Sequence, residues 1–343
     1  MNAATTATDA STTNKRRKSS IFERHPKATL GFIWVLSLIL FFGLTEVMLR
    51  HFSGLGQPVL FYKNSSFGYR LKPNQDTTRF GGATFRVNNL GLRANMDWDS
   101  SIKDKILFLG DSVTYGGNHI SNEYLFSEVA VERLPNFHSG NAGIPNWGVE
   151  NVYGLIVEEN FLPASIYVTT FIENDFYRGL TSGENKPWIK YEKPHFALQE
   201  LADFLWHRWI RNPRKKNRLA QQKQGQPTER VQRAVIKLKK IDAFLESKGY
   251  CHLILISPTQ LQVSNEREKD LLVKSLLDQH GVEVVYILDN IRLTTAPNDE
   301  KQSWYQDNVH LTAAGHRVWG EVIYEELRKV SHTSCQDHFS LSR

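Results

Sequence analysis

Three short segments of this chain carry side chains that together can perform acyl transfer. Ser112 follows the apolar run KILFL, and Asn174 follows the run IYVTTF. Asp307 stands three residues before His310 near the end of the chain. A serine hydroxyl is a weak nucleophile until a neighbouring base takes its proton, and His310 can be that base near neutral pH. Asp307 can accept the other imidazole N–H and fix the tautomer. The Asn174 amide and the Ser112 backbone N–H can donate to a developing oxyanion.

The elements that must position these residues alternate between strand and helix. Short apolar runs predict strands, and longer amphipathic stretches predict helices. The expected strands are 105–109, 166–171, 252–257 and 282–288, and the expected helices are 123–134, 148–160, 229–247 and 312–330. Short continuous apolar strands between helices favour a parallel sheet covered on both faces, which is a three-layer α/β/α fold. Ligands bind at the carboxyl ends of such strands, where the candidate residues stand.

Four motifs of this chain, in the same order, resemble those of the SGNH (GDSL) hydrolases. They are GDSVTYG at 110–116, NAGIPNWG at 141–148, IEND at 172–175 and DNVH at 307–310. The resemblance covers roughly residues 100–330, and the segments GYRLKPN and FRVNNLGLRAN resemble membrane-anchored bacterial members. It implies a flavodoxin-like three-layer fold with Ser112 as nucleophile, His310 as base, Asp307 as its orienting partner and Asn174 as an oxyanion donor.

The chain departs from the family pattern at two glycines. The second motif of the family usually ends in a glycine whose N–H joins the oxyanion hole, and Asn146 stands at that place. A backbone N–H survives this change, and asparagine tolerates left-handed geometry better than most residues. Gly143 is the other candidate donor. In the third motif, Ile172 replaces a glycine, which removes no catalytic group.

Other titratable residues near these motifs are expected to be structural. His316 falls inside the last helix, while His119 and Asp175 are expected to shape the pocket. The sequence has no Gly-x-Ser-x-Gly elbow, no His-Glu-x-x-His zinc motif and neither of the common nucleotide-binding glycine motifs. No metal and no organic cofactor are therefore implied.

The charge distribution argues against nucleic acid as a partner. Residues 1–27 carry a net charge of +4 and residues 208–240 carry +11, so the remainder of this +6 chain carries −9. A nucleic-acid binder presents its basic face on the folded domain itself.

An uncharged segment of 18 residues, from Ala28 to Thr45, is about long enough to cross a bilayer as a helix. A cleaved signal peptide is disfavoured because no Ala-x-Ala-like site follows, and a buried core helix would not normally follow a basic polar tail. We therefore expect a signal anchor over 28–49 after a disordered cytoplasmic tail over 1–27. The basic residues before the span place residues 51–343 outside the cytoplasmic membrane, in the periplasm where the cell has two membranes.

The rest of the chain is expected to form one domain with additions. Residues 50–100 form a connector packed on the domain, 101–331 form the hydrolase domain and 332–343 are a tail. Residues 176–227 interrupt the alternation as an insertion, with a helix near 196–211 and a flexible basic link. Its aromatic residues either pack on the body or form a substrate-lining or membrane-facing lid. The two cysteines, Cys251 and Cys335, either form one bridge or remain a buried and a free thiol.

These observations predict a serine ester hydrolase. Its position outside the membrane suggests acyl groups on envelope or secreted glycans as substrates, most simply O-acetyl groups. An O-acyltransferase or a lipid esterase would use the same triad. A non-catalytic glycan-binding subunit of an envelope assembly is the alternative of another class, and the complete triad argues against it.

Overall fold

The computed structural model describes residues 20–134, 136–184, 186, 188–211, 227–265, 267–292 and 296–330. The chain divides into two compact units, Met1–Val47 and Met48–Arg343. Residues 1–19 of the disordered tail expected over 1–27, the tail expected over 332–343 and most of the expected basic link lie outside the described residues. The described part of the first tail differs from the expectation, because Ile21–Arg24 is helical and the next helix begins at Pro26.

The first unit consists of helical chain. Helix α1 (Ile21–Arg24) is capped by Ser20, and α2 (Pro26–Ser53) continues past the unit boundary. None of the residues of α2 is buried. By length and composition α2 is able to cross a membrane, a test that a signal sequence also passes. It is longer than the span expected over 28–49.

The second unit is built on a five-stranded, fully parallel sheet in the order β6-β5-β7-β8-β9. The strands are β5 (Lys105–Gly110), β6 (His138–Asn141), β7 (Ile166–Phe171), β8 (Cys251–Ile256) and β9 (Val285–Tyr286). This is the flavodoxin-like strand order. Successive strands are added to one side of β5 and then, from β7 on, to its other side, and this switch leaves a crevice at the carboxyl ends of β5 and β7. Ser112 follows one of these two strands and Asn174 follows the other, as the sequence predicts.

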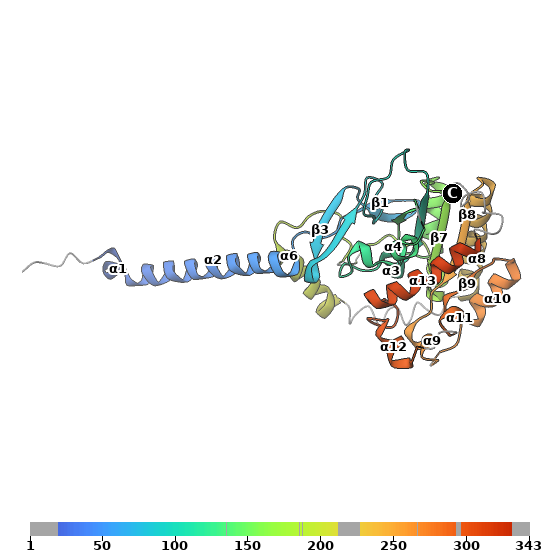
Figure 1. The fold of residues 1–343 in the computed structure, drawn as a ribbon. Coiled ribbons are helices and arrows are strands. Elements are labelled where there is room, and N and C mark those ends of the chain that lie inside the picture. The colour runs from blue at the N-terminus through green and yellow to red at the C-terminus, as the bar shows by residue number, and fades with distance from the viewer. Residues whose placement is uncertain are drawn as a thin grey trace, which may run out of the picture. The chain divides into compact units, whose positions relative to one another are not determined.

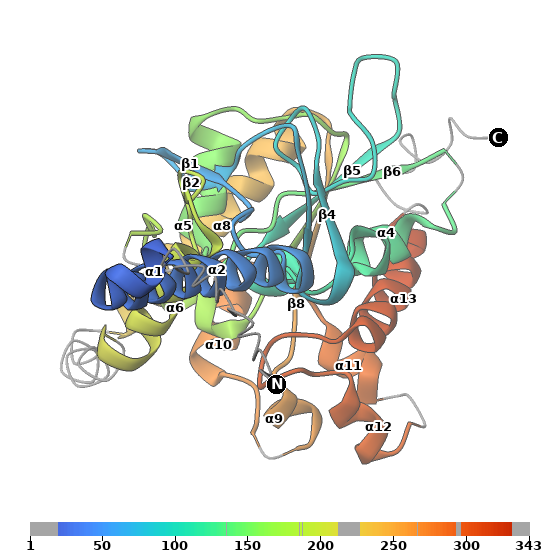
Figure 2. The same cartoon turned by 90° about the vertical axis from the view of Figure 1, so that its left-hand side faces the viewer.

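Alternate residues of the strands belong to two separate cores. Leu107 and Leu109 of β5 pack in one core, and Ile106 and Phe108 pack in the other. Figure 2 shows helices α5 and α8 on one side of the strands and α4 and α13 on the other. The helices covering the sheet are α4 (Phe126–Val131), α5 (Val149–Tyr153), α8 (Pro227–Ser247), α10 (Leu271–His280), α11 (Ile287–Arg292) and α13 (Ala313–Val330). The expected three-layer α/β/α architecture is therefore present.

The connector before the sheet forms two antiparallel hairpins (Figure 1). They pair β1 (Phe61–Asn64) with β2 (Gly68–Leu71), and β3 (Gln75–Arg79) with β4 (Ala83–Val87). Phe61, Tyr69 and Phe85 from these hairpins are buried in the core that α8 covers. The hairpins of the connector thus contribute aromatic side chains to this core.

Some elements differ from their predictions. The fourth strand, expected over 282–288, is wrong at its end, because only Val285 and Tyr286 pair with β8 and α11 begins at Ile287. The edge strand β6 has the sequence HSGN, which lacks an apolar run. In the insertion, α6 (Ala197–Trp206) continues into the π-helical turn η5 (His207–Arg211). Cys251 at the start of β8 is disulfide-bonded, and Cys335 lies outside the described residues.

Candidate active site

A strained turn after β5 presents Ser112. Gly110 has φ +152°, and a Cβ at this position would lie 2.2 Å from the Thr170 carbonyl oxygen of the neighbouring strand. Asp111 then caps the short helix α3 (Ser112–Tyr115), with its carboxylate accepting the Val113 N–H at 2.8 Å. Ser112 is therefore the first residue of a helix, where backbone N–H groups lack partners within the helix.

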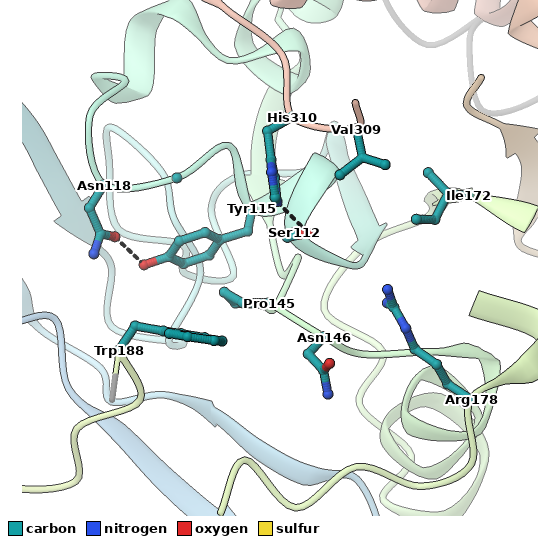
Figure 3. Close-up of a pocket in the computed structure, with 11 residues that line it drawn as sticks. Ser112, Tyr115, Asn118, Pro145, Asn146, Ile172, Arg178, Trp188, Val309 and His310 are labelled. Carbon is teal, nitrogen blue, oxygen red and sulfur yellow. Dashed lines mark hydrogen bonds between the residues drawn. The ribbon is translucent and has the colours of Figure 1, made fainter. Parts of the chain in front are cut away.

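Ser112, His310 and Asp307 form a continuous chain of side-chain hydrogen bonds. The Ser112 Oγ lies 3.0 Å from His310 Nε2, and His310 Nδ1 lies 2.7 Å from Asp307 Oδ2. Figure 3 shows the imidazole directed at the serine, with a dashed line for their hydrogen bond. With Nδ1 donating to the carboxylate, Nε2 is left to accept the serine proton, which is the arrangement that activates a serine nucleophile.

Asp307 is held in its ionised form by its local loop. Its Oδ1 accepts the backbone N–H groups of Val309 and His310, each at 2.8 Å. Partial burial would raise the pKa of Asp307, but these hydrogen bonds and the one from the His310 ring outweigh it, so the pKa lies below its ordinary value. A carboxylate that stays ionised can stabilise the imidazolium formed during acyl transfer.

Asn146 has the geometry expected of the residue that replaces a glycine. Its φ is +68°, and it lies in the cavity wall opposite Ser112 (Figure 3). Its side-chain oxygen accepts from Lys186 Nζ at 3.4 Å and its carbonyl accepts from the Thr181 hydroxyl at 3.1 Å. Among the described contacts the backbone N–H groups of Asn146 and Ser112 donate to no protein acceptor, so both are free for an oxyanion.

Gly143 does not fit its expected role as a donor. Its N–H donates to Asn141 Oδ1 at 2.9 Å, inside the buried turn after β6. A Cβ here would lie 2.5 Å from the Tyr115 backbone nitrogen, so the absence of a side chain lets this turn pack against α3. In this structure Gly143 is therefore a packing glycine whose N–H already has a protein acceptor, and its role as an oxyanion donor stays a prediction.

Asn174 lies at the carboxyl end of β7, on the 3₁₀ turn η4 (Glu173–Tyr177), and is exposed. It does not line the cavity next to Ser112, although Ile172, two residues earlier, does. Hydrogen bonds to reacting groups often form only when the substrate is bound. The oxyanion role of Asn174 stays a prediction.

A cavity of about 460 Å³ opens beside the Ser112 hydroxyl. Its wall is largely apolar and aromatic, with a cation and two amides among the residues. It is lined by Ser112, Tyr115, Gly117, Asn118, Pro145, Asn146, Ile172, Arg178, Trp188, Val309 and His310 (Figure 3). Trp188 comes from the expected insertion and is 48% exposed, so the aromatic residues of that segment do not all pack on the body.

Arg178 is a cavity residue that no pattern in the sequence singles out. Its guanidinium is paired with two fully buried carboxylates, Asp111 and Asp175, and donates to the Trp147 carbonyl at 2.8 Å. Burial, and then the neighbouring Asp111 charge, raise the pKa of Asp175 well above its ordinary value despite Arg178. The contacts with Asp111 and Asp175 position the Arg178 guanidinium in the pocket wall.

Arg93 of the connector is a second residue that was missed. It is buried, and its guanidinium donates to the carbonyls of Tyr115, Gly117 and Ile120 and to Asn122 Oδ1. These groups belong to the end of α3 and the loop that follows it, and Gly117 lines the cavity. The connector therefore fixes one wall of the site.

His316 and His119 lie outside the hydrogen-bonded triad. His316 is fully buried in α13, and its Nδ1 accepts the Phe126 N–H at 3.2 Å, so it is structural as expected. Burial, followed by Arg93 and His310, lowers the pKa of His119. Within the described part of the chain, no three His, Cys, Asp or Glu side chains are grouped to hold a metal ion.

Several solved structures are similar to this chain at low identity. A G-D-S-L family lipolytic protein from Veillonella parvula DSM 2008 is 14% identical, with a TM-score of 0.37 over 66% of this chain and 98% of that protein. The lipase/acylhydrolase from Enterococcus faecalis is 16% identical, with a TM-score of 0.37 over 66% and 96%. A two-domain esterase active on acetylated mannans is 16% identical, with a TM-score of 0.40 over 68% of this chain and 50% of that one. At such low scores and identities, the likeness assigns neither an activity nor a substrate to this chain. No family model and no curated protein matches it.

The geometry of Asn146 leads to a prediction for the oxyanion hole. Asn146→Gly should retain turnover of a small acetyl ester, because glycine keeps the N–H and adopts φ +68° without strain. Asn146→Val should lose at least about 10-fold in kcat, because a β-branched residue is strained there and shifts the N–H. Steady-state kinetics on both variants provides the measurement. Severe loss in Asn146→Gly would instead assign the function to the side chain.

Buried His316 leads to a prediction for stability against pH. Burial, and then the charge of Arg93, lower the pKa of His316 to about 3 from the ordinary 6.5. Between these values the unfolded chain binds a proton that the folded chain does not. The free energy of unfolding should therefore fall as the pH drops below about 6.5, with this one group contributing about 1.4 kcal/mol per pH unit. In His316→Gln the free energy of unfolding should change less steeply with pH, by the amount that corresponds to about one bound proton. Urea unfolding at several pH values measures this slope, with exposed His195→Gln as the control. An unchanged slope in His316→Gln would contradict the argument.

Proposed function

We propose that this chain is a serine acylesterase that forms an acyl-enzyme on Ser112 and removes acyl groups, most simply O-acetyl groups, from envelope or secreted glycans. The observation that carries the proposal is the chain of hydrogen bonds from Asp307 through His310 to Ser112, whose hydroxyl lies beside an open cavity. The serine donates toward a base that a carboxylate orients.

In the acylation step, Ser112 Oγ attacks the ester carbonyl carbon while its proton passes to His310 Nε2. The carbonyl oxygen becomes an oxyanion, which the N–H groups of Ser112 and Asn146 stabilise. The Asn174 amide is proposed as a third donor. When the tetrahedral intermediate collapses, the bond to the alcohol oxygen breaks and that oxygen takes the proton from His310. The acyl group is then bonded to Ser112.

In the deacylation step, water enters the cavity and His310 takes its proton. The water oxygen attacks the acyl carbon and forms a second oxyanion. When this intermediate collapses, the bond to Ser112 Oγ breaks, Oγ takes the proton back from His310, and the acid is released. If a sugar hydroxyl takes the place of water, the same step transfers the acyl group. Hydrolysis and transfer therefore share every residue named above and differ only in the acceptor.

The cavity wall supports a glycan ester as substrate. The apolar residues Pro145, Ile172 and Val309 can surround a small acyl group next to Ser112. Trp188 offers a partly exposed indole at the cavity, on which the apolar face of a sugar ring can pack. The amides of Asn118 and Asn146 can hydrogen-bond to hydroxyl groups.

We further propose that α2 anchors the chain in the cytoplasmic membrane, with the catalytic domain outside. The length and apolar composition of α2 support a span. Basic residues concentrate before it in the sequence, which favours a cytoplasmic N-terminus. The disulfide at Cys251 supports an oxidising compartment for the domain.

Release of acetate tests the proposed function. The detergent-solubilised full chain should release acetate from at least one member of a panel of O-acetylated glycans. Ser112→Ala should lower kcat by about 10⁶-fold, and the double variant with His310→Ala should be hardly worse, because residues acting as one unit are not additive.

The controls separate the alternatives. Ser247→Ala removes an exposed hydroxyl from α8 and should leave turnover unchanged. Acetate that appears on an added sugar instead of in solution would identify a transferase, and release of fatty acid from phospholipid alone would identify a lipid esterase. Near-normal turnover by Ser112→Ala would overturn the mechanism.

A further inference from the structure

The C-terminal end of α6 carries an exposed apolar surface. Phe204, Leu205 and Trp206 are 48%, 43% and 62% exposed, and Trp209 in the following turn is 73% exposed. We call these four residues the aromatic end of α6. Successive residues of a helix point in different directions, so the exposure of three in a row means that this end stands away from the protein core. Figure 2 shows it at the outer edge of the domain.

The other end of α6 is firmly fixed by a buried ion pair. Glu200 Oε1 lies 2.6 Å from Arg79 Nη2, and the two side chains are only 9% and 4% exposed. The second oxygen of Glu200 accepts the Gly56 N–H at 2.6 Å. Arg79 also donates to the Gly54 carbonyl. Since buried charges are costly unless they are paired, these contacts hold α6 in one position.

Part of this attachment comes from residues at the end of the apolar helix α2 and directly after it. Gly54 and Gly56 come one and three residues after its last residue, Ser53. Arg50, in the last turn, donates to the carbonyl of His195 at 3.0 Å, just before α6 begins. All of these contacts lie within the second unit, Met48–Arg343. The chain therefore leaves its apolar segment at the point where it is bonded to α6.

The chemistry of the aromatic end suits the boundary between lipid and water. Tryptophan is enriched at that boundary because its ring is apolar and its N–H is polar. In the sequence, Arg208 and Arg211 flank Trp209, and the chain continues with Arg214, Lys215 and Lys216, which lie outside the described residues. Anionic head groups attract such basic side chains.

We propose that the aromatic end of α6 inserts into the outer head-group layer of the membrane that α2 spans. The contact gives the catalytic domain a second attachment beside its anchor and fixes its orientation to the membrane. It rests on the anchoring part of the proposed function and is independent of the esterase chemistry.

Site-specific fluorescence on the reconstituted full chain tests this contact. An environment-sensitive probe on Leu205→Cys should shift to shorter emission wavelength in liposomes of phosphatidylcholine and phosphatidylglycerol. Lipids with a nitroxide near the head group should quench it more than lipids with a nitroxide deep in the acyl chain. A probe on Leu271→Cys, which is 78% exposed at the start of α10, serves as the matched control and should stay in water. The wild-type chain treated with the same probe gives the background.

Two further variants keep the outcome decisive. A probe on Leu38→Cys in α2 should be quenched by the deep nitroxide. Adding Trp206→Gln and Trp209→Gln to the Leu205→Cys chain should remove the emission shift and the quenching. The comparison is repeated at high salt, where electrostatic attraction is screened and only the insertion of the aromatic side chains is compared. Quenching at Leu38 with an aqueous signal at Leu205 would overturn the contact and leave the anchor standing. An aqueous signal at both positions would overturn both. Acetate release reports on the esterase proposal separately.

Discussion

The hydrogen bond between Ser112 and His310 joins residues that stand 198 positions apart in the chain, and the rest of the domain makes that approach possible. The serine is fixed by a glycine turn after β5 and by the Asp111 cap of α3. The histidine is fixed by the Asp307 loop just before α13. The histidine loop leads into α13, and Trp319 of that helix packs in the same core as Phe108 of β5. This packing therefore helps to set the distance between the serine and the histidine, on which the proposed proton transfer depends.

Two arginines that have no role in the proposed proton transfer hold the walls of the cavity in place. Arg93 gathers the carbonyl groups of the loop after α3, and Arg178 is held by two buried carboxylates at the opposite wall. In a buried setting such contacts are rigid, since each broken hydrogen bond leaves a charged group unsatisfied. The cavity therefore has fixed walls on both sides of the nucleophile. Arg93 belongs to the connector and Arg178 directly follows the turn after β7, so these two segments stabilise the walls.

The sequence was sufficient to predict the three central strands of the sheet and the residues of the hydrogen-bonded chain, because apolar runs mark buried strands and polar residues follow two of them. Strands β5 and β7 lie where the apolar runs predict them, within one residue. Strand β6 was missed because its residues HSGN are mostly polar or small, and its pairing partners come from elsewhere in the chain. The roles of Gly143, Arg93 and Arg178 depend on which backbone groups lie nearby. Such proximity is set by tertiary packing and leaves no local pattern in the sequence. The positive φ of Asn146 could be predicted, because it stands where the resembling motif usually has a glycine.

We propose that His310 and Asp307 make Ser112 a reactive nucleophile. Labelling of the folded full chain with a fluorophosphonate, followed by mass spectrometry of its peptides, is the sharpest test. We expect a single covalent adduct on the peptide containing Ser112, which disappears in Ser112→Ala and forms far more slowly in His310→Gln. An adduct on another serine, or equal labelling of the His310→Gln variant, would contradict it.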